Sequence, residues 1–249
     1  MNPKKVIVCD LDGTLAASKS PLGEDMAEVL GYVLKRHIVV VVSGGSFGQF
    51  EKQFLSQLRI DKNLFSNLYL FPTNGTTCYA YDKKEGSWKQ VYNEPLADKD
   101  KKAILKAANA VVKEFELDKA KTFGDIVEDR GSQVTISGLG QAAPLNLKEK
   151  WDPNQAKRTK MIAVLKKQIP QFEIRMGGTT SIDITKKGLD KAYAIGKIKS
   201  LLKVKDDDIV YVGDALYKGG NDEAVKSTGV DFIQEDGPVD TLEYLSRFM

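Results

Sequence analysis

The chain has 249 residues, 42% of them hydrophobic, which is enough for a substantial core and allows one large domain or two smaller ones. Lys and Arg number 37 against 34 Asp and Glu and are spread along the chain, so nucleic acid is not a predicted partner. No apolar stretch approaches the roughly 20 residues of a membrane span, and the first apolar run ends at two carboxylates, unlike a signal peptide. The two cysteines lie in apolar runs, which suits a reducing compartment. We therefore expect a cytoplasmic protein with no membrane partner, either a monomer or a homodimer.

Short apolar runs alternate with helical patterns in the first part of the chain. Strands are predicted at 6–9, 38–42 and 68–71, helices at 25–35 and 47–58, and a further strand at 208–212. Continuous β-branched runs bounded by Gly and Asp are typical of a parallel sheet covered on both faces. The pattern predicts an α/β domain.

The pattern changes from about residue 93. A charged helix is predicted at 100–117 and another at 155–168, with alternating segments at 132–137 and 173–184. These elements indicate an α+β domain with antiparallel strands and helices on one face. We expect it as an insertion at 93–186 in a sheet domain made of 1–92 and 187–249.

Two carboxylates follow the first predicted strand, in the segment Asp10-Leu11-Asp12-Gly13-Thr14. Ligands bind at the carboxyl ends of parallel strands, and side chains two apart in an extended segment share a side, so Asp10 and Asp12 are expected to converge on one substrate. A helix N-cap and a calcium loop are the alternatives, but the calcium loop lacks its third acidic position and its downstream Glu. The segment by itself favours phosphoryl transfer.

Further polar residues stand where the same site needs them. Ser43, with Gly44, follows the second valine-rich strand, where a hydroxyl and backbone N–H groups can hold phosphoryl oxygens, although glycine there also suits a simple turn. Lys191 begins a predicted helix and offers a cation to a transferring phosphoryl group, although one lysine among 37 basic residues is weak evidence alone.

A second acidic cluster follows the strand at 208–212. It consists of Asp214 and, after a glycine-rich stretch, Asn221 and Asp222. Hard oxygen ligands of this kind suit Mg²⁺, which takes a few carboxylates together with water and phosphate. The glycine-rich stretch is not a P-loop, because no Gly-Lys-Ser/Thr follows at the required spacing.

In this order, the DLDGT segment, the Ser after an apolar strand, the late Lys and the GD…ND cluster resemble the four signatures of the haloacid dehalogenase (HAD) superfamily over essentially the whole chain. The resemblance implies a Rossmann-like parallel-sheet core with an inserted α+β cap of the C2 type, the IIB subfamily. It also implies that Asp10 attacks phosphorus to form an aspartyl-phosphate, and that Asp12 protonates the leaving oxygen and later deprotonates the acceptor.

The same resemblance implies roles for the other residues. Ser43 and Lys191 would orient and neutralise the phosphoryl group. Mg²⁺ would be held by Asp10, the Asp12 backbone carbonyl and Asp214. Asp222 would be a further ligand or a carboxylate just beyond the ligands, positioned by Asn221.

Three segments resemble the eukaryotic-type phosphomannomutases more closely than generic sugar phosphatases. They are Glu128–Gln141, Gly177–Asp183 leading into Gly188–Tyr193, and Gly213–Asp222. The residues that match family substrate-binding positions, or lie beside them, are Gly44, Arg130, Gly178, Ser181, Asp183 and Asn221. The resemblance therefore implies a phosphorylated sugar or similar small metabolite as substrate.

Two departures from that family lie in the predicted cap. Gln141 and Lys148 stand at substrate-facing positions where the mutases carry arginine, so a bidentate phosphate clamp is lost. A mutase must hold a bisphosphorylated intermediate at both ends, whereas a phosphatase only admits water. We therefore expect a Mg²⁺-dependent phosphatase. The alternatives are a phosphomannomutase or phosphoglucomutase that needs a sugar bisphosphate activator, and a non-catalytic ligand-binding module.

Overall fold

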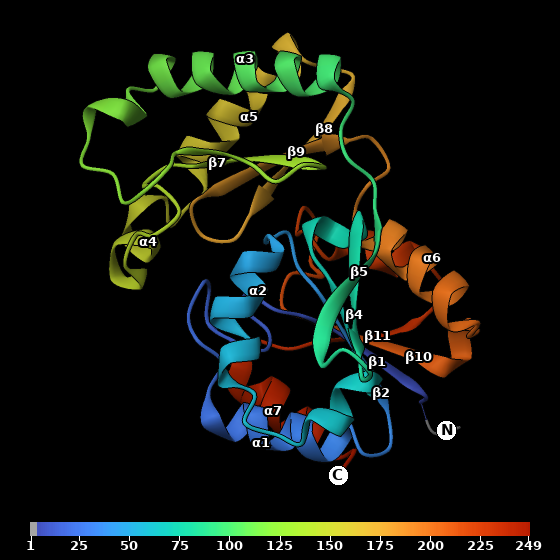
Figure 1. Cartoon of the computed structure of the whole chain (residues 1–249). Helices are drawn as coiled ribbons and strands as arrows, with labels where there is room; N and C mark the ends of the chain where they lie inside the picture. The colour runs from blue at the N-terminus through green and yellow to red at the C-terminus, as the bar shows by residue number, and fades with distance from the viewer. Residues whose placement is uncertain (1–3) are drawn as a thin grey trace. The chain divides into compact units, whose positions relative to one another are not determined.

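The computed structural model describes residues 4–249 and divides into two compact units (Figure 1). The first unit runs to Asn93 and resumes at Asp190, and the second is Glu94–Leu189. The sequence-based boundaries were 1–92 with 187–249 for the core and 93–186 for the insertion, and residues 1–3 of that core lie outside the described part.

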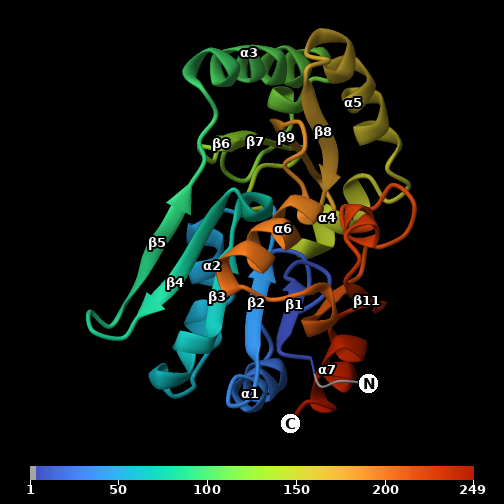
Figure 2. The same cartoon turned by 90° about the vertical axis from the view of Figure 1, so that its right-hand side faces the viewer.

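A seven-stranded sheet in the order β11-β10-β1-β2-β3-β4-β5 forms the centre of the first unit. The five strands from β11 to β3 are parallel, and β4 and β5 add an antiparallel hairpin, seen at the left edge of Figure 2. The strands are β1 (Val6–Asp10), β2 (Ile38–Val42), β3 (Leu68–Phe71), β4 (Thr77–Asp82), β5 (Ser87–Asn93), β10 (Ile209–Gly213) and β11 (Asp231–Gln234). This confirms the predicted Rossmann-like α/β class. The hairpin and β11 were not predicted, because much of β5 and β11 is exposed and carries no continuous apolar run.

Helices cover both faces of this sheet (Figure 1). Alternate residues of one strand point to opposite faces, so Ile7 and Cys9 pack with α1 (Glu24–Val33), α2 (Phe47–Gln53) and α7 (Pro238–Ser246), whereas Val6 and Val8 pack with α6 (Lys191–Leu202). The helix predicted at 47–58 is shorter than expected, because α2 gives way to a 3₁₀ turn at Leu55–Gln57. Within residues 4–249, no helix is long and apolar enough to cross a membrane.

An antiparallel sheet in the order β6-β7-β9-β8 forms the second unit, with helices packed on one face. Its elements are α3 (Asp98–Glu114), β6 (Val127–Asp129), β7 (Gln133–Ser137), α4 (Leu145–Trp151), α5 (Ala156–Gln168), β8 (Phe172–Gly177) and β9 (Ser181–Lys186). The alternating segment predicted at 173–184 is in fact two strands joined by a turn, because Gly178 takes a positive φ of 33°. Val134 and Ile136 point into the helix-covered core, so Thr135 and Ser137 line the opposite, polar face.

A buried ion pair ties α5 to the β8–β9 turn. Asp152 accepts hydrogen bonds from the backbone N–H groups of Lys157 (2.9 Å) and Arg158 (3.2 Å) and from the Arg158 guanidinium (2.9 Å). Arg158 also donates to the carbonyls of Gly177 (3.2 Å) and Gly178 (2.7 Å). Burial by itself raises the pKa of Asp152, but these donors lower it below its ordinary value. The pair therefore anchors the turn that precedes β9.

We expect Asp152→Ala to reduce the free energy of unfolding by about 3–5 kcal/mol, because it leaves the Arg158 guanidinium buried without its carboxylate. Since the folded pKa of Asp152 is lowered, its contribution is present above the unfolded pKa and lost as the pH falls through the folded value. Urea unfolding at neutral and acidic pH measures both effects. Lys119→Ala, which removes an exposed ion pair with Glu116, is the control and should cost little. Equal losses in the two variants would contradict the assignment.

Candidate active site

The DLDGT segment connects directly to the acidic cluster after β10. Asp10 is the last residue of β1, and Gly13 has a φ of 97°. A Cβ on Gly13 would meet the Asp214 carboxylate at 2.6 Å, so only glycine lets Asp214 approach this closely. Thr14 donates its hydroxyl hydrogen to Asp214 (2.9 Å) and accepts from the Asp214 backbone N–H (3.0 Å). The Gly-Thr pair of the motif thus positions Asp214 beside the end of β1.

Lys191 begins α6, as predicted, and its side chain lies among the carboxylates. Asp190 caps α6 by accepting from the backbone N–H groups of Ala192 and Tyr193. The Lys191 ammonium, 1% exposed as a residue, is 2.6 Å from Asp10 Oδ1 and also pairs with Asp222. One buried cation therefore joins the end of β1 to the loop after β10.

The Asp222 carboxylate accepts hydrogen bonds from three protein groups, none of which was predicted. Its Oδ1 accepts from Lys191 and from the Tyr211 hydroxyl (2.7 Å), and its Oδ2 accepts from the Ala215 backbone N–H (3.0 Å). A Cβ on Gly213 would meet Asp222 at 2.5 Å, which explains glycine at the end of β10. Tyr211 had not been predicted as a site residue, because a tyrosine in an apolar strand gives no local signal. Because these donors fix the Asp222 carboxylate beside Lys191, Asp222 can position the Lys191 ammonium as well as bind a metal ion.

The charges of this cluster do not balance without a further cation. Burial raises the pKa of Asp10, the Lys191 ammonium lowers it, and Asp222 and Asp214 raise it again, with a net shift well above the ordinary value. Burial also raises the pKa of Asp214, and Asp222 adds to that shift. Burial opposes the charged form of Lys191, yet Asp10 and Asp222 raise its pKa above the ordinary value. Lys191 therefore stays charged, but it compensates only one of three carboxylates.

The donor set fits a hard divalent cation. Carboxylate oxygens of Asp10, Asp214 and Asp222 all lie within 4.8 Å of one another. Asp10 Oδ2 is buried and has no hydrogen-bond partner in the structure, so one acceptor of the cluster points at a position that no protein group fills. Carboxylate oxygens are among the ligands that Mg²⁺ prefers in proteins.

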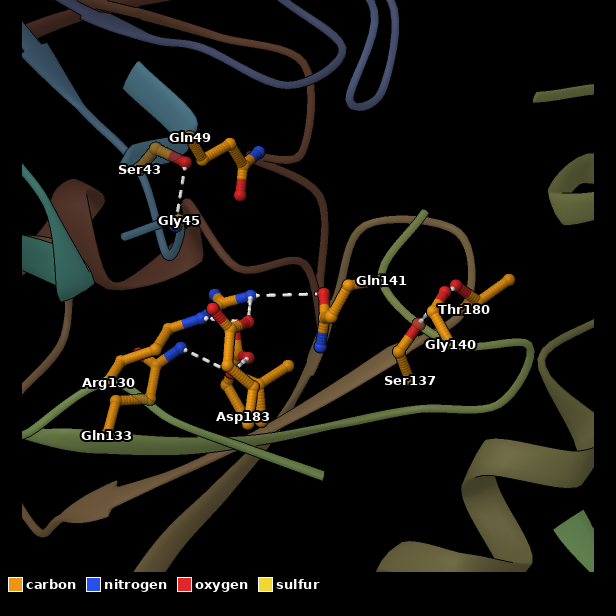
Figure 3. Close-up of polar contacts among 12 residues, drawn as sticks. Ser43, Gly45, Gln49, Arg130, Gln133, Ser137, Gly140, Gln141, Thr180 and Asp183 are labelled. Carbon is orange, nitrogen blue, oxygen red and sulfur yellow. Dashed lines mark hydrogen bonds and ion pairs between the residues drawn. The ribbon is translucent and has the colours of Figure 1, made fainter. Parts of the chain in front are cut away.

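Asp12 lies in a different network from the one that joins the other three aspartates. Its carboxylate accepts from Gln49 (3.0 Å), Gln53 (3.0 Å) and the Lys19 backbone N–H (2.5 Å), and Ser43 Oγ lies 3.5 Å away. Ser43 also accepts from the Gly45 backbone N–H (3.0 Å), which holds the turn after β2 that contains Gly44 (Figure 3). The Asp12 side chain does not belong to the carboxylate cluster, and its metal role through the backbone carbonyl stays a prediction.

In the second unit, Arg130 and Gln141 are in contact. The Arg130 guanidinium donates twice to Glu128 Oε2 (2.9 and 2.7 Å) and once to Gln141 Oε1 (3.2 Å; Figure 3). Asp183 accepts from Thr135 (2.7 Å), its partner in the β7–β9 register. Three predicted substrate residues of this unit thus surround the polar face of one sheet.

The remaining predicted residues have simpler positions. Ser181 begins β9 opposite Ser137, Gly178 forms the preceding turn, and Lys148 lies in α4. Asn221 directly precedes Asp222 in the loop after β10. Their substrate roles stay predictions.

Replacing Lys191 by Met should destabilise the fold in a pH-dependent way. Since Lys191 lowers the pKa of Asp10, its loss raises that pKa further above the unfolded value. A group with a raised folded pKa costs stability as the pH rises through that pKa. We expect a loss of about 3–5 kcal/mol near pH 7.5 and a smaller loss near pH 5.

Urea unfolding in the presence of EDTA measures these losses. Lys199→Met on the same helix, whose ion pair with Asp206 is partly exposed, is the control and should show little effect at either pH. A loss that is independent of pH would contradict the charge argument.

Comparisons with known proteins identify the family of this chain. The model of the family described as Eukaryotic phosphomannomutase matches residues 26–247. The phosphomannomutase of Schizosaccharomyces pombe is 26% identical over 225 residues, covering 88% of this chain and 84% of its own, and that of Encephalitozoon cuniculi is 26% identical over 246 residues, covering 96% and 91%.

Solved structures share the fold at low sequence identity. A C-terminally truncated IMP-nucleotidase of Plasmodium falciparum has a TM-score of 0.73 and 15% identity, over 99% of this chain and 72% of its own. A haloacid dehalogenase-like hydrolase of Bacteroides thetaiotaomicron has a TM-score of 0.64 and 16% identity, over 99% and 100%. With the family match over most of its length, the chain belongs to the eukaryotic phosphomannomutase family and is an enzyme of the haloacid dehalogenase superfamily.

Proposed function

We propose that the protein is a Mg²⁺-dependent phosphatase that hydrolyses a phosphorylated sugar or a similar small metabolite through an aspartyl-phosphate. The first unit supplies the chemistry and the second selects the substrate. The free, buried state of Cys9 and Cys78 suits a reducing compartment, so we place the reaction in the cytoplasm.

In the first step a carboxylate oxygen of Asp10 attacks phosphorus, and the bond from phosphorus to the ester oxygen breaks with its electron pair on that oxygen. Asp12 donates a proton to this leaving oxygen. In the second step Asp12 takes a proton from water and the water oxygen bonds to phosphorus. The bond from phosphorus to the Asp10 oxygen breaks with its electron pair on that oxygen, which releases inorganic phosphate and regenerates the Asp10 carboxylate. Lys191 and Ser43 hold the phosphoryl oxygens in place during both steps.

Asp10, Asp214 and the Asp12 backbone carbonyl would hold Mg²⁺, with Asp222 close by. The bound ion would neutralise negative charge on the transferring phosphoryl group. The carboxylate excess around Lys191 supports this assignment.

The contact between Arg130 and Gln141 is the observation that favours hydrolysis over phosphoryl transfer to a sugar. Gln141 offers Arg130 a carbonyl oxygen and brings no charge of its own. A mutase must bind a second phosphate while its intermediate reorients, and the mutases that this chain resembles carry arginine at positions 141 and 148 in addition to the arginine at position 130. Of these three guanidinium groups only that of Arg130 remains here, and it is paired with Glu128. A monophosphate therefore suits this surface better than a bisphosphate.

Phosphomannomutase activity is the second candidate, because the family match extends from residue 26 to residue 247. The two reactions share the aspartyl-phosphate and differ only in the acceptor, which is water in one and a sugar hydroxyl in the other.

Phosphate release should require both Mg²⁺ and Asp10. We expect purified protein with Mg²⁺ to release phosphate from a hexose phosphate, and Asp10→Asn to release none, because the amide cannot form the acyl-phosphate. Asp207→Asn, an exposed carboxylate before the amino end of β10, is the matched control and should keep full activity. Unchanged turnover in Asp10→Asn would overturn the mechanism.

The acceptor can be assigned by incubating the protein with mannose 1-phosphate or glucose 1-phosphate, with and without the hexose 1,6-bisphosphate, and measuring free phosphate and the 6-phosphate isomer. We expect free phosphate and no 6-phosphate isomer in the wild type. Gln141→Arg should introduce the missing guanidinium and tighten bisphosphate binding by about tenfold.

Gln168→Arg, an exposed glutamine at the end of α5, is the charge-matched control and should not affect bisphosphate binding. Isomer that forms in the wild type only with bisphosphate would establish the mutase instead.

A further inference from the structure

Two glutamines of α2 hold the Asp12 carboxylate from the same side of the helix. Gln49 and Gln53 are four residues apart, so their side chains lie on adjacent turns. Gln49 Nε2 donates to Asp12 Oδ2 and Gln53 Nε2 donates to Asp12 Oδ1, each at 3.0 Å. Gln53 is 4% exposed, so its amide makes this bond away from bulk water.

The two amides also orient each other. Gln49 Nε2 donates a second hydrogen bond to Gln53 Oε1 at 3.0 Å, which turns the Gln53 amino group toward Asp12. A Cβ on Gly45 would lie 2.5 Å from Gln49 Oε1, so the absence of a side chain at Gly45 leaves the space that the Gln49 amide occupies. The arrangement is therefore built into the turn after β2 as well as into α2.

The two oxygens of Asp12 are not equivalent in this network. Oδ1 accepts from Gln53 and from the Lys19 backbone N–H, which occupies both of its acceptor directions. Oδ2 accepts from Gln49 at 3.0 Å and from the Ser43 hydroxyl over a longer 3.5 Å. Oδ2 is thus the less tightly held oxygen, because a proton or a substrate atom there displaces only the long bond from Ser43.

We propose that Gln49 and Gln53 form an amide clamp, made of these two side chains, that positions Asp12 so that Oδ2 carries the proton of the reaction. The inference rests on the proposed function, in which Asp12 is the acid and base. The proton passes from Oδ2 to the leaving oxygen and returns from water, while the clamp donates its hydrogen bonds and transfers no proton. Gln49 and Gln53 are positioning residues.

Neutral amides suit this task for a physical reason. An amide fixes a carboxylate by a directed hydrogen bond and adds no charge next to the transferring phosphoryl group. A glutamate at either position would oppose the Asp12 carboxylate directly, and a lysine would compete with Lys191 for phosphoryl oxygens.

The test compares Gln53→Met and Gln49→Met, which keep the length of the side chain and remove the amide. The control is Gln57→Met, because the Gln57 side-chain amide donates to the hydroxyl of its exposed neighbour Ser56 and not to Asp12. Each variant is assayed with a hexose 6-phosphate, whose alkoxide leaving group needs a proton, and with p-nitrophenyl phosphate, whose phenolate does not.

We expect both clamp variants to lose about 10- to 100-fold in kcat/KM on the hexose phosphate and less than about threefold on p-nitrophenyl phosphate. Gln57→Met should change neither by more than about twofold. Asp12→Asn should show the same difference between the two esters, with a larger loss. Should Gln53→Met fail to fold, Gln49→Met carries the same comparison from a less buried position.

The clamp would be overturned if its variants lost kcat/KM equally on the two esters while Asp12→Asn still lost more on the hexose phosphate. The proposed function would then remain intact. Equal losses in Asp12→Asn itself would overturn the acid role. A wild type that hydrolyses neither ester would overturn the proposed function, and hydrogen exchange at the Lys19 amide would then decide the clamp. We expect the Lys19 amide to exchange faster in Gln53→Met than in the wild type, and an unchanged exchange rate would overturn the clamp.

Discussion

A single buried ammonium group organises the catalytic side of this protein. Lys191 stands at the start of α6 and pairs with Asp10 from β1 and with Asp222 from the loop after β10. Three carboxylates around one lysine leave negative charge uncompensated in a buried place, which is costly unless a cation joins them. Gly13 and Gly213 let the Asp214 and Asp222 carboxylates approach without a Cβ in the way. The proposed Mg²⁺ would offset the cost of that uncompensated charge.

Asp10 and Asp12 are two residues apart and yet have distinct environments. Asp10 is buried beside a cation and other carboxylates, and one of its oxygens has no protein partner. Asp12 is held by neutral amides and a backbone N–H. Enzymes that use two carboxylates commonly separate their roles by environment in this manner. Here the separation suits the proposed roles of Asp10 as nucleophile and Asp12 as proton carrier.

The second unit carries the residues on which the proposed change of acceptor rests. Its polar sheet face carries Arg130 and Asp183 in ordered networks, while position 141 contributes a neutral amide. Function resides in such sites more than in the fold, so membership of a mutase family and hydrolytic chemistry are compatible. The buried Asp152–Arg158 pair fixes the turn before β9, and with it the start of the strand that bears Ser181 and Asp183.

The sequence by itself determined the parallel sheet, the place of Asp10 and Asp12 at the end of one strand, and the place of the second acidic cluster after another. Each of these follows from local rules: apolar runs form buried strands, and the carboxyl ends of parallel strands share one edge. Only the tertiary structure decided that Asp222 is bound by Tyr211, that Gln49 and Gln53 hold Asp12, and that Arg158 pairs with Asp152 inside the second unit. A glutamine on a helix or a tyrosine in a strand has the same local pattern whether it binds a catalytic carboxylate or only fills space. What distinguishes them is a partner in another element, brought near by packing, and packing is a property of the whole fold.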